Sequence, residues 1–240
     1  MMTEEQKLLI IESGKNYFRK IIIPNHLKNL KKLKLKDFNI NPFLVNYLAS
    51  FLCGNTEPES IAKALIYPRI LGTSINTSFG SHTQKLVSEL VAHAGTASGI
   101  DGIDIEFIDA IDGRRKYCQC KAGPNTINYD DKETISSHFM HLQYKARIDG
   151  LPIQLNDMIV GVLYGDKSEL SDHYKKINEK TCPVYCGAEF WEHVTGDKEF
   201  YYRLTKAFGE VVEEDGVDAR IHLSEKIKEL ADEIREKGGL

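Results

Sequence analysis

Four polar side chains on a predicted β-hairpin have the types and spacing to hold a divalent metal ion and activate a water molecule. The two arms of the hairpin alternate polar and apolar side chains, the period of strands with one buried face. The pair Asp112-Gly113 between them favours a two-residue type I′ turn. That turn predicts a register in which Asp104 opposes Lys121 and Glu106 opposes Gln119, with opposed Cβ atoms within about 5.5 Å. Two carboxylates, an amide and an amine would then share one face.

The opposite face of the hairpin is predicted to be buried, and it carries the motif Cys118-x-Cys120. Together with Cys182-x₃-Cys186 this motif suggests a zinc site as one alternative. Core thiols are the favoured interpretation, because cysteine is common in protein interiors. His138 and His141 lie three residues apart on a predicted helix and are interpreted as helical neighbours or exposed groups rather than metal ligands.

The composition is typical of a globular protein, with 42% apolar and 28% charged residues in a chain of 240. The five cysteines, an odd number, argue against a disulfide framework and favour reduced thiols. The sequence has no long apolar run and no secretory signal, so we expect a cytoplasmic protein without membrane contact.

Positive charge is concentrated near the N-terminus although the net charge is −4. Residues 15–36 carry lysine and arginine without any acidic residue, whereas the chain from Glu210 onward is rich in aspartate and glutamate. Two interpretations of the basic stretch stay open: a phosphate-binding surface, or a solvated helix face.

The predicted elements alternate between helices and strands in the centre of the chain, which indicates an α/β fold with a mixed sheet. Pro24 is expected to end the first helix, and residues 67–78 are expected to form a polar loop. The predicted helices cover residues 4–23, 25–36, 41–52, 57–66, 79–94, 130–148, 188–195, 197–214 and 218–237, and the predicted strands are the hairpin at 102–122 and segments at 155–165 and 184–185.

The order of these elements, with an aspartate on the first hairpin strand and an x-Lys pair on the second, resembles the PD-(D/E)xK nuclease superfamily. Two further segments, residues 121–128 (KAGPNTIN) and 185–197 (YCGAEFWEHVTGD), are similar to type II restriction endonucleases. The resemblance implies a mixed central sheet flanked by helices. The expected layout is a single domain over residues 1–240, with a helical N-terminal part at 1–66, a nuclease core at 67–215 and a C-terminal helix at 216–240.

The resemblance also implies roles for individual residues. Asp104 would bind the metal, Lys121 would be the catalytic lysine, and the backbone carbonyl of Cys120 would be a further ligand. Gln119 occupies the position where the family has a second acidic residue. A neutral amide oxygen can bind Mg²⁺ but neutralises no charge. Two residues could supply the missing carboxylate: Glu89 on the preceding helix, or Glu106.

Family resemblance further implies Mg²⁺ as cofactor, with Mn²⁺ as a possible substitute and no nucleotide cofactor. Hydrolysis would leave 5′-phosphate and 3′-hydroxyl ends. Side chains suited to phosphate and base-edge contacts occur in the predicted polar loop and after the hairpin. These candidate DNA-binding residues are Arg69, Thr73, Ser74, Asn76, Thr77, Asn125 and Asn128.

The function expected on these grounds is Mg²⁺-dependent, sequence-specific cleavage of double-stranded DNA by a homodimer. Two-fold protein symmetry would match a palindromic site, and a companion DNA methyltransferase would act on the same site. Two alternatives stay open: a structure-specific repair or recombination nuclease, and a non-catalytic DNA-binding relative, which the uncharged Gln119 would suit.

Overall fold

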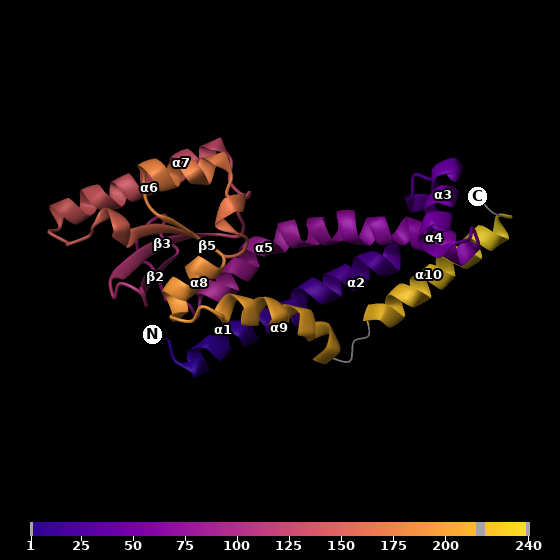
Figure 1. Ribbon diagram of the computed structural model, residues 1–240, viewed down its shortest axis with the longest axis horizontal. Coiled ribbons are helices and arrows are strands. Elements are labelled where there is room, and N and C mark those ends of the chain that lie inside the picture. Colours follow the sequence, from indigo (N-terminus) through magenta and orange to yellow (C-terminus); the bar gives the residue numbers. More distant parts are fainter. Residues whose placement is uncertain (1, 215–218, 239–240) are drawn as a thin grey trace. The chain divides into compact units, whose positions relative to one another are not determined.

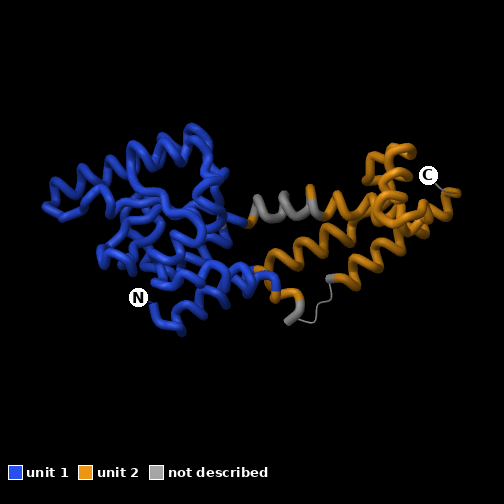
Figure 2. The backbone as a smooth tube through the Cα atoms, in the orientation of Figure 1, with its two compact units in different colours: residues 1–17, 83–209 blue, residues 18–82, 210–240 orange. Residues whose placement is uncertain are grey.

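The chain forms two compact units, residues 1–17 with 83–209 and residues 18–82 with 210–240 (Figure 2). The computed structural model describes the backbone of residues 2–214 and 219–238, and all their side chains except those of 71, 73–81, 84, 213, 214 and 219. The first unit contains the sheet, and residues 4–17 belong to it rather than to the helical part. The assignment of the whole chain to one domain stays a prediction.

The first unit is built on a five-stranded mixed sheet in the order β1-β2-β3-β4-β5 (Figure 1). The first three strands are antiparallel, and β3, β4 and β5 run parallel. The strands are β1 (Thr96–Ala97), β2 (Ile105–Ile108), β3 (Arg115–Lys121), β4 (Met158–Val162) and β5 (Val184–Cys186). The predicted α/β fold with a mixed sheet is therefore confirmed.

Helices cover both faces of this sheet (Figure 1). One face carries Met158 and Val160 and packs against α6 and α7 in a shared apolar core. On the other face Phe190 of α8 lies against Gly161, where an added Cβ would come within 2.3 Å of the Phe190 ring. The helices of this unit are α1 (Glu4–Tyr17), most of α5 (Ile75–Val91), α6 (Tyr129–Ile148), α7 (Asp172–Lys180), α8 (Ala188–Thr195) and most of α9 (Phe200–Glu214), with 3₁₀ turns at Leu155–Asp157 and Lys167–Glu169.

The second unit is a helical assembly with its own apolar core. Leu30 of α2, Ala49 of α3, Ile66 of α4 and Leu230 of α10 are all fully or almost fully buried in it. Its main elements are a π-helical turn at Phe18–Ile22, α2 (Ile23–Lys32), a 3₁₀ turn at Leu35–Asp37, α3 (Pro42–Cys53), α4 (Pro58–Pro68), a π-helical turn at Arg69–Ser74 and α10 (Ala219–Glu236). Within residues 2–214 and 219–238, no helix combines the length and apolar character that crossing a membrane requires.

Two predicted interruptions of helices are wrong. Pro24 does not end the first helix, because the π-helical turn leads directly into α2 and Pro24 lies in its first turn, where no N–H donor is needed. Residues 67–78 are helical rather than a loop. Their hydroxyl and amide side chains have only weak conformational preferences, which the surrounding helices override. The prediction also lacked β1 and the short polar helix α7.

The hairpin register differs from the prediction by two residues. Ile105 pairs with Cys118, whereas the predicted turn would place it opposite Cys120. A type I′ turn needs positive φ at both central residues, and among the described residues only glycines, here Gly113 with φ 71°, adopt it. The loop is instead closed by the N–H of Gly113 donating to the carbonyl of Asp109 (2.9 Å). A shift of two residues preserves the faces of the paired positions, so both cysteines are buried as predicted.

Candidate active site on the β2–β3 hairpin

A β-bulge at the start of β2 sets the position of Asp104. Ile105 pairs with Cys118 of β3, and the N–H of the preceding residue, Asp104, donates to the carbonyl of Cys118 (2.9 Å). Two residues, Asp104 and Ile105, therefore oppose the single residue Cys118, as in a β-bulge. The extra residue interrupts the alternation of faces. Ile103 lies in the core on the α6 side, whereas Ile105 shares the α8 side with Phe107. Bulges of this kind re-aim side chains next to active sites.

The carboxylate of Asp104 is held at the edge of β3. Its Oδ2 accepts a hydrogen bond from the N–H of Cys120 at 2.6 Å. The chain turns at Gly102 (φ 76°), before a further residue of β2 could pair there, so the side chain takes the place of a backbone acceptor. In an antiparallel pair the N–H and C=O of one residue point to the same neighbouring strand. The carbonyl of Cys120 therefore faces the side on which Asp104 lies.

Gln119 precedes Cys120 on β3, the central strand of the sheet. It pairs with Val160 of β4, and only 7% of its surface is exposed. Its Oε1 atom is buried and has no hydrogen-bond partner within the described residues. Leaving a buried acceptor unsatisfied costs about 1–3 kcal/mol, and such atoms in folded proteins usually contact a water molecule or an ion. The oxygen is thus available to a ligand.

Lys121 ends β3, two residues after Gln119 and on the same face of that strand. It is partly buried, and in the part of the chain that the structure describes its ammonium group has no ion pair. The backbone carbonyl of Lys121 accepts from the N–H of Leu163 (2.9 Å), which ties this end of β3 to β4. The backbone of Lys121 is therefore held in place, while its ammonium group has no ion-pair partner among the described residues.

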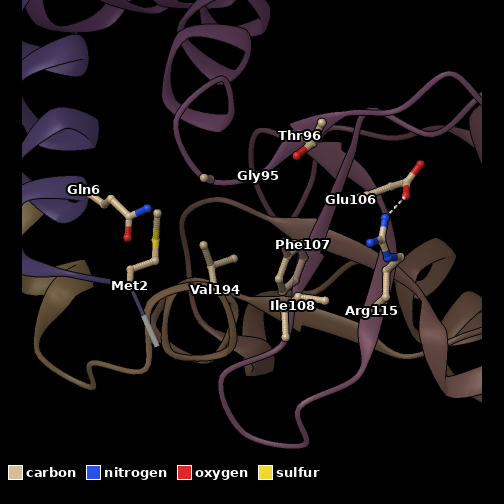
Figure 3. A pocket seen from close by; sticks show the side chains of 10 residues that line it. Met2, Gln6, Gly95, Thr96, Glu106, Phe107, Ile108, Arg115 and Val194 are labelled. Carbon is tan, nitrogen blue, oxygen red and sulfur yellow. Dashed lines mark hydrogen bonds and ion pairs between the residues drawn. The ribbon is translucent and has the colours of Figure 1, made fainter.

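The two candidates for a second carboxylate are placed differently. Glu106 is engaged by Arg115 (3.0 Å) and by the hydroxyl of Ser98 (2.8 Å), and it lines a cavity of about 300 Å³ at the edge of β2 (Figure 3). Glu89 is exposed on α5. Across the described residues, no three histidine, cysteine, aspartate or glutamate side chains are grouped so that they could share a metal ion. The hairpin thus combines one carboxylate, one amide, one amine and a backbone carbonyl.

The candidate DNA-binding residues are distributed over both units. Arg69 is exposed in the helical unit, at the π-helical turn after α4. Asn125 is exposed in the turn after β3. Asn128 caps α6, since its side chain accepts from the N–H of Asp131 at 2.9 Å. The side chains of the remaining candidates lie outside the described residues; these are Thr73, Ser74, Asn76 and Thr77.

The zinc alternative is not supported by the positions of the cysteines. Cys118 lies against Gly161 on the α8 side of the sheet, whereas Cys182 and Cys186 belong to the core on the α6 side. Burial raises the pKa of Cys182 to about 12 and that of Cys186 to about 11. The separation of the two cysteine pairs by the sheet therefore favours core thiols.

A buried polar cluster behind the hairpin loop was missed by the sequence prediction. Both oxygens of Asp109 lie within 2.9 Å of Nδ1 of His193, whose ring stacks on Tyr185 with centroids 3.9 Å apart. Lys116 has no exposed surface and bonds Asp112 and the carbonyl of residue 156, with Asp109 at 3.6 Å. The available sequence signal was a lysine in step with two buried cysteines on β3, a position that requires a carboxylate partner.

The contact made by His138 of α6 was also not predicted from the sequence. Its ring lies directly against Gly102, where an added Cβ would come within 2.2 Å of the ring. Gly102 precedes Asp104 by two residues, so this contact supports the turn that leads into the bulge. Nδ1 of His138 is buried and lacks a hydrogen-bond partner among the described residues.

Comparison with known protein families gives a match over most of the chain. The family model described as type II restriction endonuclease EcoO109I matches residues 9–215, which include the hairpin and most of both units. No curated protein matches the chain. The match spans well over half of the 240 residues. The chain therefore belongs to the EcoO109I family of type II restriction endonucleases.

Proposed function

We propose that this protein is a Mg²⁺-dependent endonuclease that hydrolyses phosphodiester bonds at specific sites in double-stranded DNA. The proposed centre is of the PD-(D/E)xK type and consists of Asp104, Gln119, Lys121 and the carbonyl of Cys120. The observation that carries the proposal is the buried Oε1 of Gln119, which has no hydrogen-bond partner among the described residues and lies on the residue before Cys120, whose N–H holds the carboxylate of Asp104. A companion methyltransferase acting on the same DNA sites is part of the proposal.

The available donors fit magnesium. Mg²⁺ is a hard cation that prefers oxygen ligands, and it commonly takes one or two carboxylates and keeps several water molecules. Asp104 supplies a carboxylate, while Gln119 and the Cys120 carbonyl supply neutral oxygens, so the set suits Mg²⁺ and also Mn²⁺. The bound ion would neutralise charge on the scissile phosphate and acidify water.

The protein groups then divide the remaining work. Asp104 would hold the ion with one carboxylate oxygen, since the N–H of Cys120 holds the other. Lys121 orients the attacking water or donates a hydrogen bond to the phosphate oxygen that gains charge in the transition state. Glu106 would contribute a carboxylate only after releasing Arg115, so the proposed centre depends on Asp104 alone.

Digestion of plasmid DNA with Mg²⁺ tests this proposal directly. The wild-type protein is expected to give discrete fragments with 5′-phosphate ends, and Asp104→Asn is expected to abolish them because the ion loses its only charged ligand. Smears, or cleavage confined to branched DNA, would instead favour the structure-specific nuclease. If folded wild-type protein binds DNA and cuts none of varied sequence, the non-catalytic alternative is correct.

A homodimer is the second part of the proposal, and the outer face of α3 supports it. Its inner residues Val45 and Ala49 are buried, yet the opposite side exposes Phe43 (91%) and Phe51 (74%), with Tyr47 stacked on Phe51. A helix that is apolar on both sides is normally covered on both sides. No charged residue occurs from position 38 to position 56, so two copies of this face meet without repulsion.

The area is sufficient for an association of two copies. Large aromatic side chains bury about 150–250 Å² each, so the three rings and the neighbouring Leu44 would remove about 500 Å² per protomer from water. A symmetric pair would bury about 1,000 Å² in total, which reaches the lower range of specific interfaces. A closed two-fold interface of this kind uses the same patch on both copies.

Replacing Phe43 and Phe51 together with serine is therefore expected to convert a dimer into monomers and to reduce double-strand cleavage. The mass in solution, measured by light scattering at micromolar concentration, is the readout. Tyr144→Ser with Ile148→Ser, which removes exposed apolar side chains from α6, is the matched control and should stay dimeric. An unchanged mass of the α3 variant would show that another surface mediates the association.

A further inference from the structure

The basic stretch of residues 15–36 has no role in the proposed active site. In the structure its centre is α2, which is amphipathic. Leu27 and Leu30 point into the core of the helical unit, and Lys28, Lys31 and Lys32 are exposed on the surface. A solvated helix face would display mixed charge, whereas this one is purely cationic.

These three lysines line a groove of about 490 Å³ within the helical unit. Ile23, Pro24 and Leu27 contribute apolar walls, so the groove has a cationic rim and an apolar floor. Lysine can lay its aliphatic stem along such a floor while keeping its ammonium group in water.

The charges of the three lysines have no acidic partner in the part of the chain that the structure describes. Within the described residues, none of the three lysines forms an ion pair, whereas Lys7, Lys63 and Lys226 each pair with an acidic side chain. The whole chain carries a net charge of −4, so attraction of a polyanion requires a local surface of this kind.

We infer that this groove binds the sugar-phosphate backbone of DNA away from the cleaved bond, an inference that rests on the proposed function. From residue 28 to residue 32 a helix rises about 6 Å, and successive phosphates of one strand advance about 3.4 Å along the duplex axis. The lysines therefore match two or three neighbouring phosphates. Contacts of this kind position a protein on DNA without reading sequence.

Replacing Lys28, Lys31 and Lys32 together with glutamine tests the inference. The measurement is the equilibrium affinity for a long duplex in Ca²⁺, without cleavage, at several salt concentrations. Each phosphate contact contributes about 0.9 to the slope of log K against log salt, so the triple variant should lower the slope by about 2–3. A slope equal to that of the wild type would overturn the inference.

The matched control is Lys175, Lys176 and Lys180 on α7, also replaced with glutamine. These lysines are exposed, and their replacement removes the same total charge. An equal decrease in slope for both triples would mean that only net charge matters, and the groove would then have no special role. A change in mass in solution with an unchanged slope would assign the groove to a protein interface instead.

Two further readouts separate the possible failures. If the wild type does not cut DNA in Mg²⁺ but the groove variant alone lowers the slope, the proposed function is wrong and the groove assignment stands. If the triple variant unfolds, the single variants Lys28→Gln, Lys31→Gln and Lys32→Gln each should lower the slope by about 0.9. Three single variants without any effect would also overturn the inference.

Discussion

Replacing Lys121 with alanine is expected to lower the rate of DNA cleavage by about 10²–10⁴-fold while DNA binding in Ca²⁺ remains nearly unchanged. Among the described residues, the ammonium group of Lys121 forms no ion pair. Its removal therefore leaves no carboxylate without a partner there, and the fold should not be destabilised. What the variant loses is a cation that interacts with the phosphate as negative charge develops, and such an interaction affects kcat rather than substrate affinity.

Lys121→Arg separates charge from geometry. The guanidinium group retains the positive charge but is planar and bulkier than an ammonium group, and the two are not interchangeable at a site with defined geometry. We therefore expect intermediate activity for this variant. Lys175→Ala on the exposed surface of α7 is the control and should cut at the wild-type rate.

Two results would contradict the assignment. An unchanged kcat for Lys121→Ala would remove Lys121 from the chemistry. Loss of affinity with a normal rate at saturating DNA would make it a DNA-binding residue only. Single-turnover cleavage and equilibrium binding, measured on the same protein, distinguish these cases.

The sequence was informative where local chemistry decides the structure. Asn41 caps α3 with its side chain accepting from the N–H groups of Phe43 and Leu44, and Gly54 ends the helix with φ 75°, close to the predicted bounds. The burial of Cys118 and Cys120 also followed from simple alternation. Both features depend on residues close together in the chain.

Features that depend on distant residues could not be predicted in the same way. Asp109 and Lys116 are buried because His193, far along the chain, and the segment before β4 close over them. Those contacts stabilise a loop that is longer than the two-residue turn predicted from the Asp112-Gly113 pair. The observed pairing of β2 with β3 follows from this longer loop. No property of the hairpin sequence alone distinguishes the two registers, because a shift of two residues keeps the same faces buried.

The bulge at Asp104 shows the same limit within the candidate site. Alternation predicted that Asp104 and Gln119 belong to the two arms of one hairpin, and Asp104 does lie directly before β2 while Gln119 lies on β3. It did not predict that Asp104 would turn to the N–H of Cys120, since this requires Gly102 to bend the chain against His138 of α6. The sequence thus indicated that these residues lie on one hairpin, but it did not indicate the orientation of Asp104.

Replacing Lys116 with methionine is expected to destabilise the α/β unit by about 3–5 kcal/mol. Methionine fills similar volume, so the loss is electrostatic rather than a loss of packing. Lys116 is fully buried, donates to Asp112 and lies 3.6 Å from the buried carboxylate of Asp109, so its removal takes a buried cation away from two carboxylates. Urea denaturation followed by circular dichroism measures the change.

A surface pair and a double variant provide the controls. Lys167→Met breaks the exposed pair with Glu189 and should change the free energy of unfolding by at most about 1 kcal/mol. Lys116→Met combined with Asp109→Asn should cost less than the sum of the two single changes, because each single change already removes the interaction between the two groups. Strict additivity would show that the two buried groups do not interact.

The pH dependence of stability gives an independent test of the same contact. Burial alone would raise the pKa of the Asp109 carboxyl, but hydrogen bonds from His193 and from the N–H of Ile111, with the nearby charge of Lys116, lower the pKa below its ordinary value. A carboxyl with a lowered pKa contributes stability above its unfolded pKa of about 3.9, and this stability is lost as the pH falls through the folded value. Since Lys116→Met removes one of the charges that lower the pKa of Asp109, the folded pKa of Asp109 should lie closer to its unfolded value, and the stability lost as the pH falls below about 3.9 should be smaller in the variant. Superimposable pH profiles, after the overall loss is subtracted, would mean that the lysine does not act on Asp109 and that its burial serves Asp112 alone.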